Sequence, residues 1–311
     1  RNMQLSQPSI DQLRIFLAVV DEGSFNAAAK RMGRAISAIS YGISQLEALL
    51  AMRLFEREGS RRPELTPAGR ALLPSARAVA GDMDALLAKA RDHHQGLESE
   101  LTLVIDVMYP AAALAALLKS FITAFPTVDL QVHVEALGGV AAMLLDGRAD
   151  LGVGGPVVSD YPELNRSVIG AVELVPVAAP DHPLAALDPI PPGIARQHLQ
   201  LVLSDRSPLT EGREFSVTAA RTWRLADLGA KHALLLEGIG WGNMPLHLVE
   251  GDLAARRLIR LKVPENPGVE YAFAAMWRRD CPPGPARVWL RQALQDQLCP
   301  RKGTAKMENL P

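Results

Sequence analysis

The chain has 311 residues, enough for about two domains, and its 48% hydrophobic and 22% charged content excludes a disordered or fibrous protein. Its 33 basic and 34 acidic residues leave a net charge of -1, which taken alone argues against nucleic-acid binding, because phosphate binders usually carry excess basic charge. The two cysteines, Cys281 and Cys299, lack metal-ligand spacing, and the apolar stretch over 107–118 is shorter than the roughly 20 residues of a membrane helix.

Apolar spacing predicts three short helices in the first fifty residues. The first covers residues 10–22, with Ser9 and Gln12 forming a capping box at its start. A second helix covers residues 25–32. The third covers residues 36–50 and places its apolar side chains on one face.

The last two of these helices are joined through Gly33 and indicate a helix-turn-helix, whose second helix can enter a major groove about 12 Å wide. Ser37, Ser40 and Tyr41 give that helix an uncharged polar face. An ordinary three-helix bundle is the alternative. Residues 30–62 contain seven basic and three acidic side chains, a net charge of +4, which favours DNA binding.

Residues 54–57 and 62–65 flank Gly59 and predict a small hairpin. A long helix follows over residues 67–92, and Pro74 predicts a kink in its first turns. Apolar side chains along this helix alternate steps of four and three residues, the spacing of a coiled-coil seam: Leu72, Ala76, Val79, Met83, Leu86 and Ala90. An amphipathic helix packed against its own domain is an equally good interpretation.

From residue 101 onward, strands alternate with helices. The pattern predicts strands over 101–107, 128–135 and 150–153, with helices over 111–125 and 140–145 between them. This order implies right-handed crossovers and a parallel sheet covered by helices, so the fold class is α/β. Later segments repeat the pattern, with strands over 172–179, 199–203 and 269–277 and helices over 225–237 and 286–298.

Five short blocks stand in the order and spacing of a known signature: Ser24 to Ala29, Ile39-Ser40 with Ile43, Gln45 to Glu47, Arg53 to Arg57, and Leu65 to Gly69. They resemble the N-terminal signature of LysR-type transcriptional regulators. The resemblance continues through Phe121 with Phe125-Pro126, Leu145 to Gly147 with Ala149 to Gly152, His182 to Ala185, and Gly238 to Gly242 with Pro245. It therefore covers residues 10–298.

The resemblance implies a winged helix-turn-helix over residues 1–66, a linker and dimerisation helix over 67–96, and an effector-binding domain over 97–298. That domain would resemble periplasmic binding proteins, with one α/β subdomain over 97–170 and 268–298 and another over 171–267. Residues 299–311 would form a flexible tail. The implied partners are double-stranded promoter DNA, a small-molecule effector and further copies of the chain in a homodimer or homotetramer, and RNA polymerase is a further candidate.

The start of the third helix departs from the family, which commonly has Gln followed by Pro where this chain has Ile36 and Ser37. Glutamine pairs with adenine, whereas isoleucine makes only apolar contacts, for example with a thymine methyl group. We therefore expect shape readout from Ile36 and hydrogen bonds from Ser37, Ser40 and Tyr41. Burial of Ile36 is the alternative. We expect phosphate or minor-groove contacts from the flanking basic residues Arg34, Arg57, Arg61 and Arg62.

Small molecules bind open α/β sheets beyond the carboxyl ends of the strands. Here those positions are Met108 and Tyr109, Gly154, and the run Ser204, Asp205 and Arg206. Arg206 is a candidate for binding a carboxylate, although Asp205 partly cancels its charge. The run Gly240 to Asn243, which contains Trp241, is a further candidate for the cleft wall, with core packing as the alternative for Trp241.

Other classes fit less well. A P-loop and a nucleophile elbow are both missing from the sequence, so we expect no enzyme, cofactor or metal. The cysteine usage and the lack of a secretory signal predict a cytoplasmic protein. A soluble solute-binding module whose N-terminal helices serve only oligomerisation is the alternative. Residues 1–95 carry 13 basic and 10 acidic side chains, so a basic N-terminal part is masked by an acidic remainder and neutrality does not exclude DNA.

Overall fold

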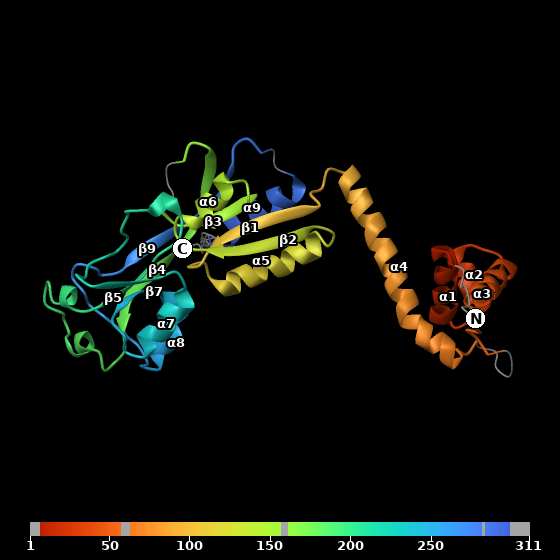
Figure 1. Ribbon diagram of the computed structural model, residues 1–311, viewed down its shortest axis with the longest axis horizontal. Coiled ribbons are helices and arrows are strands. Elements are labelled where there is room, and N and C mark those ends of the chain that lie inside the picture. The colour runs from red at the N-terminus through yellow and green to blue at the C-terminus, as the bar shows by residue number, and fades with distance from the viewer. Residues whose placement is uncertain (1–6, 57–62, 157–160, 282–283, 299–311) are drawn as a thin grey trace, which may run out of the picture. The chain divides into compact units, whose positions relative to one another are not determined.

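The computed structural model describes residues 7–56, 63–156, 161–281 and 284–298 (Figure 1). The chain divides into two compact units, residues 1–94 and 95–311, and each has its own hydrophobic core. Within the described part of the chain, no helix is long and apolar enough to cross a membrane. The tail predicted over residues 299–311 lies outside the described residues.

The first unit begins with the three predicted helices, α1 (Ile10–Glu22), α2 (Phe25–Met32) and α3 (Ile36–Leu50), and all three ranges are confirmed. The capping box is also present: the Gln12 backbone N–H donates to Ser9 Oγ over 3.2 Å, and the Ser9 N–H donates to Gln12 Oε1 over 2.8 Å. Such caps satisfy N–H groups that the first helical turn leaves unpaired.

The core of this unit is built by α1 and α3, where Phe16, Ile39 and Leu46 are fully buried. Phe55 packs edge-on against Phe16, with ring centroids 5.7 Å apart, and pairs with Leu65 in an antiparallel bridge. This bridge forms the base of the predicted hairpin, whose tip lies outside the described residues.

Helix α4 (Pro67–His94) continues unbroken through Pro74, so proline does not end it. Its first half packs against α1, where Ala76 is buried and Arg77 forms an ion pair with Asp21 over 2.8 Å. From Val79 onward the predicted seam is largely uncovered, since Val79 is 49% and Leu86 is 60% exposed. Packing against its own domain therefore accounts for Leu72 and Ala76 but not for Val79 or Leu86.

The second unit is built on a seven-stranded sheet of order β2-β1-β3-β9-β4-β7, with β8 also paired to β4. The strands are β1 (Glu100–Asp106), β2 (Asp129–Glu135), β3 (Leu151–Gly154), β4 (Leu164–Ala178), β7 (Gly242–Pro245), β8 (Ile259–Arg260) and β9 (Val269–Arg278). Strands β1, β2 and β3 run parallel, as predicted. Strand β9, however, runs antiparallel to both β3 and β4, so the predicted parallel sheet is wrong for this half.

The physical reason lies in β4, which is fifteen residues long and begins eight residues before its predicted start. It pairs with β9 along most of its length, with one register shift between Val168 and Gly170. The first half of β4, in which only Leu164 and Ile169 are buried, lacks the apolar run that marks a buried strand, so the sequence pattern does not reveal this half.

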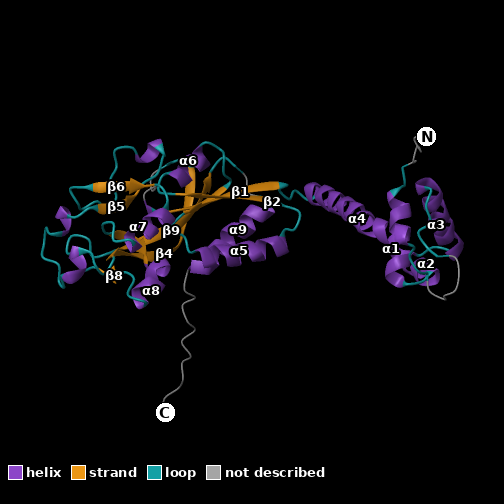
Figure 2. Cartoon of the chain, turned by 60° about the horizontal axis from the view of Figure 1, so that its bottom comes forward, coloured by secondary structure: helices purple, strands orange, loops and turns teal. Residues whose placement is uncertain are grey.

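Helices cover this sheet: α5 (Ala111–Ala124), α6 (Gly139–Leu145), α7 (Leu228–Leu236), α8 (Leu246–Ala254) and α9 (Pro285–Leu298). Figure 2 shows α5 and α9 side by side, and their elements are in contact. A separate two-stranded parallel sheet joins β5 (Gln200–Leu203) to β6 (Thr222–Leu225). The helix predicted from residue 225 begins at Leu228 because the Asp227 side chain caps it.

Candidate functional site

One face of α3 is exposed along its first two turns. Ile36 is 49% and Tyr41 is 66% exposed, whereas Ile39 is fully buried in the core. Ser37 and Ser40 are exposed on the same part of the helix. The structure therefore excludes burial as the role of Ile36 and presents an uncharged surface of apolar and hydroxyl groups.

Arg34, which precedes this helix, is held by a carboxylate. Its Nη1 and Nη2 donate to the two carboxylate oxygens of Asp11 over 2.7 and 2.8 Å. This hydrogen bond lowers the pKa of Asp11 below its usual value. Lys30 and Arg53, which enter the sequence prediction only through the local charge, are exposed and form no ion pair within the described part of the chain. The predicted contacts Arg57, Arg61 and Arg62 lie outside the described residues.

In the second unit, a cavity of about 260 Å³ opens between the two sheets. Met108, after β1, lines it as predicted for a strand end, together with Leu203 of β5 and Tyr271 of β9. Asn243 of β7, which belongs to the run expected at the cleft wall, also lines it. Lys231 of α7 lines it as well, and no sequence pattern singled it out. A single lysine in the apolar helix segment over 228–236 is the signal that could have identified Lys231.

Lys231 is buried, with 2% of its surface exposed. Its Nζ donates to the backbone oxygen of Asn243 over 2.6 Å. Burial lowers the pKa of Lys231 to about 7, because removal from water disfavours the charged form. Gly242 makes room for the side chain, since a Cβ at this position would lie 3.2 Å from Lys231 Cε and 2.5 Å from the Leu201 carbonyl oxygen.

A second buried polar group closes one side of the cavity. The Tyr271 hydroxyl donates to Asp106 Oδ2 over 2.8 Å, and the backbone N–H of Met108 donates to Oδ1 over 2.8 Å. Burial raises the pKa of Asp106 to about 6 and, together with the charge of Asp106, raises the pKa of Tyr271. A Cβ at Gly155 would lie 2.0 Å from the Tyr271 oxygen, so only glycine leaves space for this contact.

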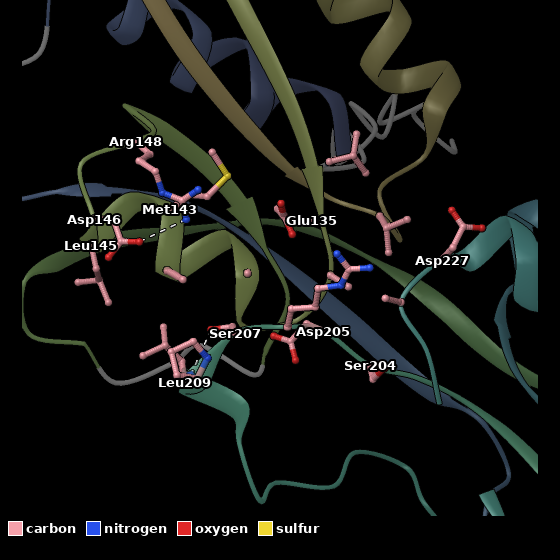
Figure 3. A pocket seen from close by; sticks show the side chains of 18 residues that line it. Glu135, Met143, Leu145, Asp146, Arg148, Ser204, Asp205, Ser207, Leu209 and Asp227 are labelled. Carbon is pink, nitrogen blue, oxygen red and sulfur yellow. Dashed lines mark hydrogen bonds and ion pairs between the residues drawn. The ribbon is translucent and has the colours of Figure 1, made fainter. Parts of the chain in front are cut away.

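The loop after β5 separates two further hollows of about 640 and 680 Å³. Ser204, Asp205 and Arg206 line both. Figure 3 shows Asp205 and Ser207 on this loop, across the hollow from Glu135. The Thr210 hydroxyl donates to Asp205 Oδ1, while Asp205 Oδ2 is buried without a hydrogen-bond partner.

Three predicted ligand residues are not among those that line these cavities. Tyr109 packs edge-on against Phe273, with ring centroids 5.4 Å apart, and burial raises its pKa to about 12. Gly154 is buried within β3. Trp241 is fully buried in a separate small core, and its indole N–H donates to the Ala195 carbonyl oxygen over 3.3 Å. The cleft assignment of Trp241 is therefore wrong, and core packing is its role.

Comparison with known families identifies both units. A model of the LysR substrate binding domain matches residues 94–299, and a model of bacterial regulatory helix-turn-helix proteins of the lysR family matches residues 10–70. The chain belongs to the LysR family of transcriptional regulators. The alternative, a solute-binding module whose N-terminal helices serve only oligomerisation, is not supported, because the helix-turn-helix model matches those helices.

Named relatives in the LysR family cover nearly the whole chain. The probable HTH-type transcriptional regulator YhaJ of Escherichia coli strain K12 is 31% identical over 289 residues, 90% of this chain and 94% of YhaJ. The HTH-type transcriptional regulator PunR of the same strain is 30% identical over 290 residues, 91% of this chain and 92% of PunR. Like these relatives, the chain is a DNA-binding transcriptional regulator, and its second unit is an effector-binding domain.

The fold also matches solved LysR-family structures. A cysteine mutant of OxyR from Corynebacterium glutamicum has a TM-score of 0.51 and 20% identity, covering 95% of this chain and 94% of OxyR. A full-length OxyR variant from Pseudomonas aeruginosa has a TM-score of 0.50 and 18% identity, covering 94% of this chain and 100% of that one. Within the described part of this LysR-family chain, no three His, Cys, Asp or Glu side chains are grouped to hold a metal ion.

Proposed function

We propose that the N-terminal half of α3 reads promoter DNA in the major groove. The observation that carries this proposal is the exposure of Ile36 and Tyr41, two large side chains beside the exposed Ser37 and Ser40. Large apolar and aromatic side chains that lie together on one exposed helix face are available for contact with a partner. Apolar groups and hydroxyls can contact thymine methyl groups and base edges.

Phosphate contacts would come from basic side chains around this helix. Lys30 and Arg53 are available because they form no ion pair within the described residues. Arg57, Arg61 and Arg62 remain the proposed contacts from the wing. Arg34 is a weaker candidate, because a phosphate would compete with Asp11 for its guanidinium group.

We further propose that a small molecule bound in the 260 Å³ cavity of the second unit modulates DNA binding. The cavity lies at strand ends, where ligands bind α/β sheets, and combines apolar walls with a few polar groups. The loop at Ser204, Asp205 and Arg206 borders the neighbouring hollows and would contact a ligand larger than the cavity.

The proposed domains and the proposed assembly of several copies are connected through helix α4. We propose a DNA-binding domain over 1–66, a dimerisation helix over 67–96 and an effector domain over 97–298, with subdomains as the sequence predicts. The uncovered seam on α4, including Val79 and Leu86, supports pairing between copies, and two dimers would form a tetramer. The protein would act in the cytoplasm on promoter DNA, without catalytic activity, and RNA polymerase is a further proposed partner.

The test is a fluorescence anisotropy titration with a DNA fragment from upstream of the protein's own gene and a scrambled fragment. Tyr41→Ala should weaken binding to the specific fragment about tenfold or more, since one base contact contributes about 1–3 kcal/mol, and should leave scrambled DNA unaffected. Trp223→Ala, which removes a 50% exposed aromatic side chain from β6, is the matched control. Equal affinity of the unmodified chain for both fragments would overturn the proposal.

A further inference from the structure

The cavity of the effector domain contains a buried cation with no carboxylate beside it. Lys231 is buried, with 2% of its surface exposed, and its Nζ donates a hydrogen bond to the Asn243 carbonyl oxygen over 2.6 Å. An ammonium group has three N–H donors. Within the described residues, Nζ forms no second hydrogen bond and no ion pair with an acidic side chain.

A buried charge without a counter-ion is costly in a folded protein. The cost is visible here in the pKa of Lys231, which burial alone lowers to about 7. A side chain that only filled space at this position would be apolar, as are its neighbours Leu228 and Leu235 on the buried face of α7. Gly242 lies against the lysine stem, so the local backbone accommodates this side chain.

The remaining walls of the cavity are mostly apolar. Met108, Leu137, Leu174 and Phe215 line it, and the Tyr271 hydroxyl is occupied by Asp106. Glu214 and Glu270 are exposed lining residues, and Glu214 forms an ion pair with Arg224. Lys231 is the single cationic side chain among the described lining residues, which suits one negative charge better than a dianion such as phosphate.

We propose that the effector is a small monocarboxylate, whose carboxylate binds the Lys231 ammonium while its apolar part packs against Met108, Leu137 and Leu174. This inference rests on the proposed effector function of the cavity. A cavity of about 260 Å³ is below the usual range of roughly 300–1,000 Å³ for ligand pockets, so the ligand is small.

The proposal predicts a pH dependence of binding. Only protonated Lys231 attracts the carboxylate, so affinity should fall up to tenfold per pH unit above about pH 7. Glu214, Glu270 and Tyr271 are the other titratable side chains on the cavity wall. Strands β4, β5 and β6, which pack against α7, contribute no titratable side chain to it. His232, the neighbour of Lys231 on α7, is bonded instead to Asp252 over 2.7 Å.

The experiment uses isothermal titration calorimetry of the full-length chain with phenylacetate and with phenylacetamide, its uncharged counterpart of nearly equal shape. Phenylacetate should bind at least tenfold more tightly than the amide at pH 6.5, and Lys231→Met should abolish this preference. Lys262→Met is the matched control, because it removes the same charge from an exposed lysine paired with Asp188. It should retain the preference.

No preference for the carboxylate in the unmodified chain, including no binding of either probe, would overturn the proposal. A preference that survives Lys231→Met would also overturn it. If that variant unfolds, the pH dependence of phenylacetate binding to the unmodified chain decides, since constant affinity from pH 6 to pH 9 contradicts a role for Lys231. DNA binding by the unmodified chain without added ligand is measured separately, so failure of this inference is distinguishable from failure of the proposed function.

Discussion

Arg34 and Asp11 form a two-pronged ion pair in which Nη1 and Nη2 each contact a different carboxylate oxygen, over 2.7 and 2.8 Å. The pair joins the turn between α2 and α3 to the first turn of α1. It neutralises a cation that the sequence pattern places among the DNA contacts. The basic charge available to DNA near α3 is therefore smaller than a count of arginines implies.

Asp11→Ala should release Arg34 and strengthen DNA binding. One additional phosphate contact would make the slope of log affinity against log salt steeper by about one unit. Anisotropy titrations at several salt concentrations measure this slope. Asp146→Ala, which frees Arg148 from an exposed pair in the other unit, is the charge-matched control. A slope that stays the same in Asp11→Ala would contradict the proposed position of Arg34 near the phosphates.

Ile36→Gln should change the preferred base at one position of the DNA site, because glutamine can pair with adenine while isoleucine reads shape and methyl groups. Binding-site selection from a random library, performed with both proteins, measures the preference. Since Ile36 is 49% exposed, the substitution should not destabilise the fold. An identical selected site would show that Ile36 does not contact bases.

Leu86→Ser should weaken self-association through α4. Leu86 is 60% exposed in the single chain, and burying one leucine contributes about 1.5–3 kcal/mol. Two copies of the change across a symmetric dimer should raise the dimer dissociation constant about a hundredfold or more, since every 1.4 kcal/mol is tenfold. Sedimentation equilibrium measures this constant, with Leu248→Ser, a 39% exposed leucine of α8, as the control. An unaltered dimer would place the interface elsewhere.

Tyr271→Phe should destabilise the effector domain in a pH-dependent way. Burial raises the pKa of Asp106 to about 6, above its unfolded value of 3.8. Ionisation of Asp106 therefore lowers the free energy of unfolding increasingly as the pH rises from about 4 to 6. The Tyr271 hydroxyl stabilises the ionised form of Asp106, because it donates a hydrogen bond to the carboxylate. Its loss should therefore lower the free energy of unfolding by about 1–3 kcal/mol at pH 8 and by less at pH 5.

Urea unfolding at both pH values measures the effect of Tyr271→Phe. Tyr161→Phe is the control, since the Tyr161 side chain forms no hydrogen bond within the described residues. Equal destabilisation at pH 5 and pH 8 would mean that the hydroxyl does not act through the Asp106 carboxylate.

Local signals in the sequence predict the N-terminal helices, because caps and helical spacing are properties of neighbouring residues. Ser9 with Gln12 marks the start of α1, and the predicted bounds of α1 to α3 are those observed. The antiparallel pairing of β9 with β4 depends on contacts between residues about a hundred positions apart, and no local pattern encodes it. The sheet direction was therefore predictable only for β1 to β3.

The candidate ligand site was predictable at Met108, because it follows an apolar strand. Lys231 and Tyr271 belong to a helix and a strand distant in sequence, and only the fold brings them to one cavity. Trp241 illustrates the opposite error, since a glycine-flanked tryptophan resembles a cleft residue yet packs in a core. Similarly, Arg34 has the charge and the sequence position expected of a DNA contact, and only the structure shows that it is paired with Asp11.

Photo-crosslinking at position 41 tests most directly whether the exposed face of α3 reads DNA. p-Azidophenylalanine replaces Tyr41 in one protein and Val168, a 73% exposed residue of β4 in the other unit, in a second protein. Irradiation with the specific DNA fragment should crosslink the first protein to DNA and leave the second uncrosslinked. Equal crosslinking of both, or none at position 41 when the complex is formed, would contradict recognition by α3.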